Sequence, residues 1–297
     1  MIPVPRGVNK YMIAGSRAGL TPVAPVFLAD RLPGLHTELM SLLRALGPSD
    51  WNRPTACALW SVKDIAAHLL DTSVRRLSFG RDRLDPTPDI PITTYADLVA
   101  YLNRLNADWV AASRRLSPAV MIDLLDFTAG QVHAFFQTLD PHSAALFPVT
   151  WAGEDVSPNW FDIGREYTER WLHQQQIREA VGAPGLTAPA WLHPTLDIFV
   201  RALPHTYRNV KAAPGASVRF DIRGEAGGVW TLVRSPARWE LFKGSDPAPA
   251  AAVGLDQETA WKLFSKGLDR VSARSRIELR GDAVLGETVL GSLAIMA

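Results

Sequence analysis

The spacing of apolar residues changes near residue 185, and this change constrains the fold more than any other feature of the chain. Before it, apolar residues recur every three or four positions over long segments, which is typical of amphipathic helices. After it, short segments alternate between apolar and polar residues, as strands with one solvated face do. The sequence therefore predicts an all-α half, about 25–185, followed by an α+β half, about 190–297.

Start and stop signals delimit the helices of the first half. Gly47-Pro48 ends the first helix, Ser61 with Asp64 three residues later is typical of a helix N-cap, and Gly182 ends the last helix. Helices are expected at about 29–46, 61–79, 94–116, 117–139 and 161–181.

The second half mixes both element types. Strands are expected at 217–222, 228–233, 239–242 and 277–279, and helices over 192–209 (interrupted at Pro204), after Asp256 and after Asp282. Because the first three strands follow one another closely, we expect an antiparallel sheet with one wet face.

Composition excludes several classes of protein. The formal net charge of +1 gives no basis for binding nucleic acid or an anionic membrane. No apolar run reaches about 18 residues, so no membrane span is expected. The single cysteine, Cys57, excludes an internal disulfide framework and fits a reducing cytosol. Any metal must therefore be held by histidine and carboxylate.

The first residues, 1–24, contain Arg6, Lys10 and Arg17 but no acidic residue. They lack an apolar core followed by a cleavage site, so we expect no signal peptide. We interpret this segment as a flexible N-terminal extension of a cytoplasmic protein.

A candidate metal site lies on two of the expected helices. Glu169 and His173 are four residues apart, so they share one helix face. His68 from a second helix would complete a two-histidine, one-carboxylate set with open coordination positions. Such a set binds a divalent ion, zinc first, although iron also suits it. The alternative is a solvated helix face on which Arg165 and Glu169 form an ordinary surface ion pair.

Other residues are weaker candidates. His133 is a rival ligand, but its position among aromatic residues favours a packed core histidine. Trp60, Trp160 and Trp171 favour core packing, and the alternative is that one or two of them line an apolar pocket over the metal. Cys57 has no partner motif and is interpreted as a small buried residue.

Two arginines of the second half are candidates for binding a substrate. Arg276 and Arg280, on or beside the last expected strand, could pair with a substrate carboxylate. A solvated strand face is the simpler interpretation.

Two segments carry a family resemblance. WSVKDIAAHL at 60–69 and REYTERWLHQQQIREAVG at 165–182 resemble the mycothiol-dependent maleylpyruvate isomerase family, which belongs to the DinB-like superfamily of metal-binding four-helix bundles. GGVW at 227–230, AWKLF at 260–264 and RGD at 280–282 are similar to the sterol-carrier-like domain that follows the bundle in many members. The resemblance thus implies a DinB-like bundle over 25–185 and a sterol-carrier-like domain over 190–297.

The resemblance also implies a chemistry. It assigns the metal to His68, Glu169 and His173, and it implies a low-molecular-weight thiol, mycothiol or an equivalent, as the nucleophile that meets the metal. The protein would then act as an isomerase or S-transferase on a small electrophile. One position departs from the pattern: many members carry Asp three residues after the second histidine, where this chain has Gln176.

Two non-enzymatic alternatives remain open at this point. One is a protein that binds apolar ligands in its second half. The other is a DinB-type stress protein with a structural metal. The Leu-rich first helix could serve the core or a homodimer interface equally well.

Overall fold

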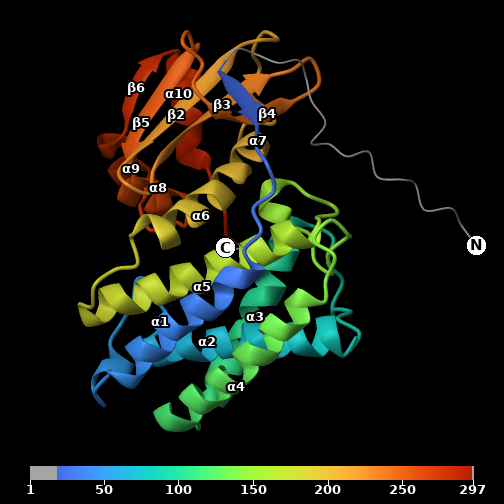
Figure 1. The fold of residues 1–297 in the computed structure, drawn as a ribbon, viewed down its shortest axis with the longest axis vertical. Helices are drawn as coiled ribbons and strands as arrows, with labels where there is room; N and C mark the ends of the chain where they lie inside the picture. The colour runs from blue at the N-terminus through green and yellow to red at the C-terminus, as the bar shows by residue number, and fades with distance from the viewer. Residues whose placement is uncertain (1–18, 296–297) are drawn as a thin grey trace, which may run out of the picture.

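The computed structural model describes residues 19–295, in which a helical half and a half built on a β-sheet lie against each other (Figure 1). The helical half contains the five long helices that the sequence predicts: α1 (Leu32–Arg44), α2 (Val62–Arg75), α3 (Tyr95–Ser113), α4 (Pro118–Gln137) and α5 (Asn159–Val181). The main difference is at the end of α2, where the chain continues as a π-helical turn, Arg76–Arg81, in place of α-helix to residue 79.

Four of these helices pack against one another. α4 contacts α1 and α2, and α5 contacts the same two helices, so α1 and α2 are each held between α4 and α5. α3 lies outside this group and packs on α2. The helices that carry the candidate ligands, α2 and α5, are therefore direct neighbours.

The second half begins with short helices: α6 (Pro189–Phe199) and, after a 3-10 turn, α7 (Leu203–Thr206). Five strands follow along the chain, with further short helices between and after them. They are β2 (Ser217–Arg223), β3 (Gly228–Arg234), β4 (Trp239–Gly244), β5 (Ala251–Asp256), α8 (Gln257–Phe264), α9 (Arg270–Arg276), β6 (Glu278–Gly281) and α10 (Ala283–Glu287).

The sheet is mixed, and this corrects the prediction of an antiparallel sheet. Within residues 19–295 the strands form one six-stranded sheet in the order β1-β4-β3-β2-β5-β6. β2, β3 and β4 form the expected antiparallel set, but β5 runs parallel to β2, with Phe220 opposite Val253. β5 was not predicted, because Ala251, Ala252 and Gly254 have low β-propensity and give its sequence no strand signature.

The N-terminal edge strand is a second correction. Residues 1–18 of the predicted extension lie outside the described residues. However, β1 (Leu20–Pro22) pairs with β4, with Leu20 opposite Gly244. The flexible extension predicted over 1–24 therefore does not include these residues, which cross to the sheet at the opposite end of the sequence (Figure 1).

One apolar core joins the two halves. A continuous cluster of buried side chains runs from Leu35 on α1 through Trp171 on α5 to Trp261 on α8 and Phe220 in the sheet. The rings of Trp171 and Trp261 meet edge to face, with centroids 5.4 Å apart. A second cluster lies among α1, α2, α4 and α5. No helix among residues 19–295 is long and apolar enough to cross a membrane.

Candidate metal site

Local sequence signals fix both helices of the site. Ser61 caps α2: its hydroxyl accepts a hydrogen bond from the Asp64 amide, and the Asp64 carboxylate accepts one from the Ser61 amide. This is the capping box predicted from the sequence. α5 ends at Gly182, whose positive φ of 71° suits glycine. The start of α2 and the end of α5 thus lie where the sequence predicts.

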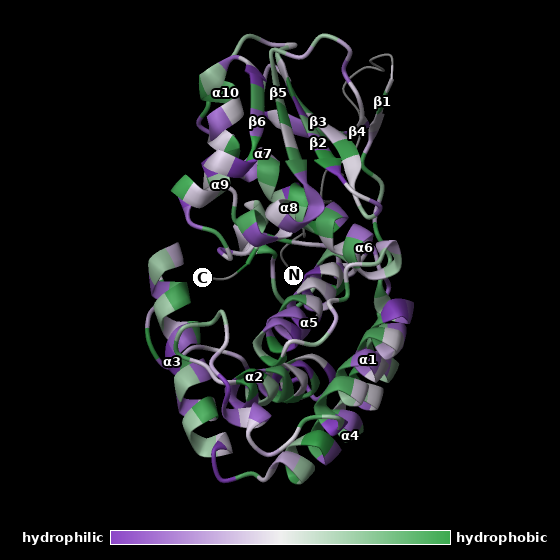
Figure 2. Ribbon diagram, turned by 90° about the vertical axis from the view of Figure 1, so that its left-hand side faces the viewer, coloured by the Kyte–Doolittle hydropathy of each residue, from purple (hydrophilic) through white to green (hydrophobic). Residues whose placement is uncertain are grey.

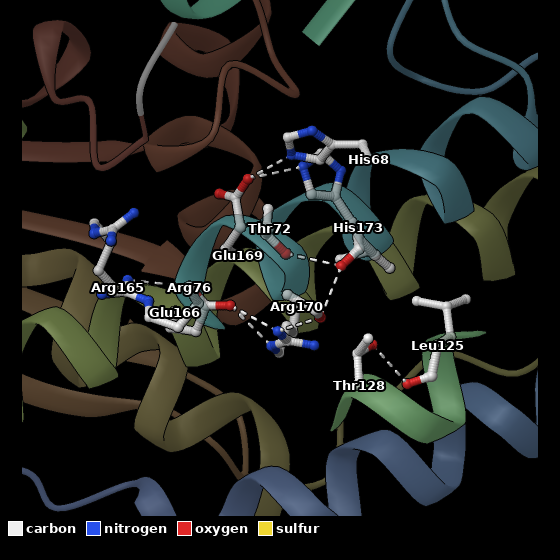
Figure 3. A network of polar contacts seen from close by, with 12 residues as sticks. His68, Thr72, Arg76, Leu125, Thr128, Arg165, Glu166, Glu169, Arg170 and His173 are labelled. Atoms are coloured by element: carbon white, nitrogen blue, oxygen red, sulfur yellow. Dashed lines mark hydrogen bonds and ion pairs between the residues drawn. The ribbon is translucent and has the colours of Figure 1, made fainter. Parts of the chain in front are cut away.

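The three predicted ligands converge (Figure 3). Nε2 of His68 lies 3.0 Å from Oε1 of Glu169, and Nε2 of His173 lies 3.1 Å from the same oxygen. One ligand atom from each residue can be chosen so that all lie within 4.8 Å of one another. Both histidines are buried, whereas the Glu169 side chain keeps 24% of its surface exposed. A small molecule can therefore approach the cluster from the side of Glu169.

The donor set fits a divalent metal ion. In tetrahedral coordination with bonds of about 2.0–2.1 Å, neighbouring ligand atoms are about 3.3–3.4 Å apart. The two nitrogen–oxygen separations in the cluster, 3.0 and 3.1 Å, are close to this spacing. Two imidazoles and one carboxylate leave further coordination positions open, as catalytic sites require. These residues could therefore hold one ion.

Without an ion, protons hold the cluster together. Burial opposes charge on His173, but the adjacent Glu169 carboxylate raises the pKa of His173 to about 10. Burial also disfavours a charged Glu169, yet the His173 charge and the imidazole hydrogen bonds hold the Glu169 pKa well below its usual range. Burial lowers the pKa of His68. These pKa shifts favour a neutral His68 beside a charged pair of His173 and Glu169.

Gln176 orients the second histidine. Its Oε1 lies 2.8 Å from Nδ1 of His173, which directs Nε2 toward Glu169. The same oxygen accepts a hydrogen bond from the Cys57 thiol at 3.3 Å. A carboxylate or carbonyl in this position fixes the tautomer of a ligating histidine and raises its affinity for metal. Nδ1 of His68, by contrast, has no hydrogen-bond partner among the described residues.

Aromatic rings enclose one side of the site. The ring of Trp60 lies 4.8 Å from that of His68 and 6.0 Å from that of His173, centroid to centroid. Trp60 therefore lines the site. Trp171 belongs to the core between the halves, and Trp160 stacks on Phe161 at 5.1 Å, as core packing predicts.

The remaining candidates lie elsewhere. His133, the rival ligand, is on α4, where its Nε2 lies 3.1 Å from Nε2 of Gln137. Arg276 and Arg280 are exposed in the sheet half. Cys57 is partly exposed rather than fully buried, and its thiol contacts Gln176 beside the site, a contact that nothing in the local sequence indicates.

A buried network of charges lies one turn from the ligands. Arg76 pairs with Asp162 through two hydrogen bonds of 2.7 and 3.2 Å and reaches Glu166 at 3.4 Å, and Arg170 lies 2.8 Å from Glu166. Burial favours the neutral acids, but the neighbouring guanidinium groups hold the pKa of Asp162 and of Glu166 below the usual range. The alternative of a solvated helix face with surface ion pairs is wrong for Glu166 and Arg170, which are buried. Burial on every side of α5 is not visible in local spacing.

Fold and site together define the class of protein: a helical half with a buried His–Glu–His cluster, joined to a sheet half. A match to a family model assigns the helical half to a family. Residues 32–178 match the mycothiol maleylpyruvate isomerase N-terminal domain, and this part of the chain belongs to that family. The match includes all three residues of the cluster.

Solved structures agree on the fold. Two crystal structures of mycothiol-dependent maleylpyruvate isomerase, one of them a histidine-to-alanine mutant, superpose with a TM-score of 0.50 each. Each covers 80% of this chain and 88% of its own, at 10% identity for the mutant and 9% for the other. The likeness therefore extends over both halves at low sequence identity. No curated protein matches the chain.

Proposed function

We propose that this protein is a metal- and thiol-dependent enzyme of the maleylpyruvate isomerase type, acting as an isomerase or S-transferase on a small electrophile. The observation that carries the proposal is the convergence of His68 and His173 on one oxygen of the partly exposed Glu169. Membership of the family supports a low-molecular-weight thiol, mycothiol or an equivalent, as the second participant.

The residues of the site have separate roles in this proposal. His68, Glu169 and His173 would hold a divalent ion, zinc as the first expectation. The three ligands carry a single negative charge, so a bound divalent ion retains positive charge and lowers the pKa of a thiol that meets it, which supplies a thiolate near neutral pH. Gln176 holds the His173 ring in the ligating orientation through its 2.8 Å contact. Trp60 excludes water from one side of the imidazoles.

The proposal also covers the fold of both halves and the location of the protein. We expect the set α1, α2, α4 and α5 to be a DinB-like four-helix bundle within 25–185, and residues 190–297 to be a sterol-carrier-like domain. We also expect a cytosolic location, in keeping with the single cysteine. A homodimer remains an expectation from the sequence alone.

The first test is elemental analysis of three purified proteins: the wild type, His173→Ala and His133→Ala. The wild type should hold about one equivalent of a divalent metal after reconstitution. His173→Ala should lose it, because the site then has only two ligands left. His133→Ala is the matched control, since it removes a half-buried histidine that is not part of the cluster, and it should keep the metal.

The second test is activity of the metal-loaded protein with thiols and electrophilic unsaturated acids. Thiol-dependent isomerisation or adduct formation that is lost in His173→Ala would support the enzyme. A wild type that binds no metal would refute the proposed mechanism and favour the apolar-ligand carrier. Metal without thiol-dependent turnover would favour the stress protein with a structural ion.

A further inference from the structure

A pocket opens between α1 and α4, and Arg170 of α5 contributes to its lining. It encloses about 240 Å³. Most of its wall area is apolar, although five of its ten lining residues have polar side chains. Its lining is formed by Leu32, Pro33, His36, Thr37, Asp126, Ala129, Gly130, Val132, His133 and Arg170. A pocket of mostly apolar walls with a few placed polar groups is typical of a small-molecule site.

Arg170 is the buried charge of this pocket. It projects from α5 away from the Glu169 carboxylate (Figure 3). Nε and Nη2 are used within the protein: they contact Glu166 at 3.0 and 2.8 Å, and Nη2 also donates to the Ser73 hydroxyl at 3.0 Å. Nη1 donates no hydrogen bond within residues 19–295, although its two N–H groups are strong donors.

The charges around the pocket favour a singly charged anion. The buried network behind Arg170 contains three guanidinium groups, those of Arg76, Arg165 and Arg170, against the carboxylates of Asp162 and Glu166. It therefore keeps one positive charge.

The outer part of the pocket limits the charge of a ligand. Asp126 is half exposed, and its carboxylate is 3.0 Å from His36 and 2.8 Å from Arg44. A negative group at the mouth disfavours a doubly charged ligand such as phosphate. The apolar walls, Leu32 and Val132 among them, suit an alkyl body.

We propose that this pocket binds a small monocarboxylate, whose carboxylate pairs with Nη1 of Arg170 and whose apolar body lies between α1 and α4. A guanidinium edge and a carboxylate match in shape and charge. The site is distinct from the proposed metal site, because His68, Glu169 and His173 do not line it.

A larger side chain at Gly130 would fill the pocket. It lies inside α4, and a Cβ added there meets no atom within 4 Å. Gly130→Leu should therefore place its side chain in the cavity with no close contact at Cβ, and the higher helix propensity of leucine should preserve or raise thermal stability. Ala119→Leu is the matched control: it adds similar bulk to an exposed position of the same helix, outside the lining.

The experiment is calorimetric titration of the full chain with butyrate, with its neutral analogue butyramide, and with inorganic phosphate. We expect saturable 1:1 binding of butyrate, at least tenfold weaker binding of butyramide, and no tighter binding of phosphate. Gly130→Leu should lose at least tenfold in butyrate affinity, and Ala119→Leu should bind as the wild type does. Thermal melts of both variants show whether the fold is kept.

Three results would overturn the proposal. Absence of saturable butyrate binding would remove the site. Equal binding of butyrate and butyramide, or tighter binding of phosphate, would refute the ligand class. Unchanged butyrate binding in Gly130→Leu would place the carboxylate elsewhere, including on an ion held by His68, Glu169 and His173.

Discussion

Replacing Gln176 with leucine should weaken metal binding without removing a ligand. The change keeps the side chain similar in size but deletes the oxygen that lies 2.8 Å from Nδ1 of His173. Loss of such a partner behind a ligating histidine costs about 10–100-fold in metal affinity, which is about 1.4–2.8 kcal/mol. A buried N–H left without an acceptor costs about 1–3 kcal/mol, so the two estimates agree.

The assay is competition for zinc between the protein and a fluorescent chelator at fixed pH. Gln176→Glu keeps an acceptor and adds charge, so it should bind zinc at least as tightly as the wild type. Gln175→Leu is the matched control on the same helix: it deletes a buried amide oxygen that accepts from the Leu186 backbone at 2.9 Å, away from the cluster. It should lower stability but leave zinc affinity unchanged. Equal zinc affinity in Gln176→Leu and the wild type would show that Gln176 does not position His173.

Three further outcomes are expected. Folding lowers the pKa of Asp162 and of Glu166. The stability that these two acids contribute is therefore present above their unfolded pKa values of about 3.9 and 4.3, and it is lost as the pH falls through the folded values. Urea midpoints should accordingly drop in acid, and they should drop less steeply in Asp162→Asn. Trp171→Ala should cost about 3–5 kcal/mol in urea unfolding, since the ring is fully buried against Trp261, and a loss under about 1 kcal/mol would contradict that packing. Ser61→Ala should cost about 1 kcal/mol by the same measurement, through loss of the capping box, and unchanged stability would show that the cap contributes nothing.

Local spacing predicted the five long helices and the shared helix face of Glu169 and His173, because both depend on helix geometry alone. Glu169 and His173 share a face by helix geometry, and the capping residues Ser61 and Gly182 act within one turn. The convergence of His68 with them rests on the packing of α2 against α5, which the family resemblance implied and periodicity did not.

What the sequence missed depends on long-range pairing. β1 is a three-residue strand whose partner lies more than 200 residues away, and β5 owes its strand conformation to β2 and β6 rather than to its own alanines and glycine. The charge network was missed for the same reason. Arg76 meets Asp162 only after tertiary packing.

The helix α5 has a consequence for how the chain folds. Most of its 23 residues are buried, yet many are polar, as the hydrophilic colouring along its length in Figure 2 shows. Several of its side chains have hydrogen-bond partners in other segments: Gln174 donates to the Leu35 carbonyl on α1, and Trp171 donates to that of Leu186 and packs on α8. Forming such a helix early in folding stabilises the chain little, because its buried polar groups find their partners only when both halves surround it. The two halves distinguished by sequence should therefore unfold as one cooperative unit, with α5 protected from hydrogen exchange until the whole chain opens.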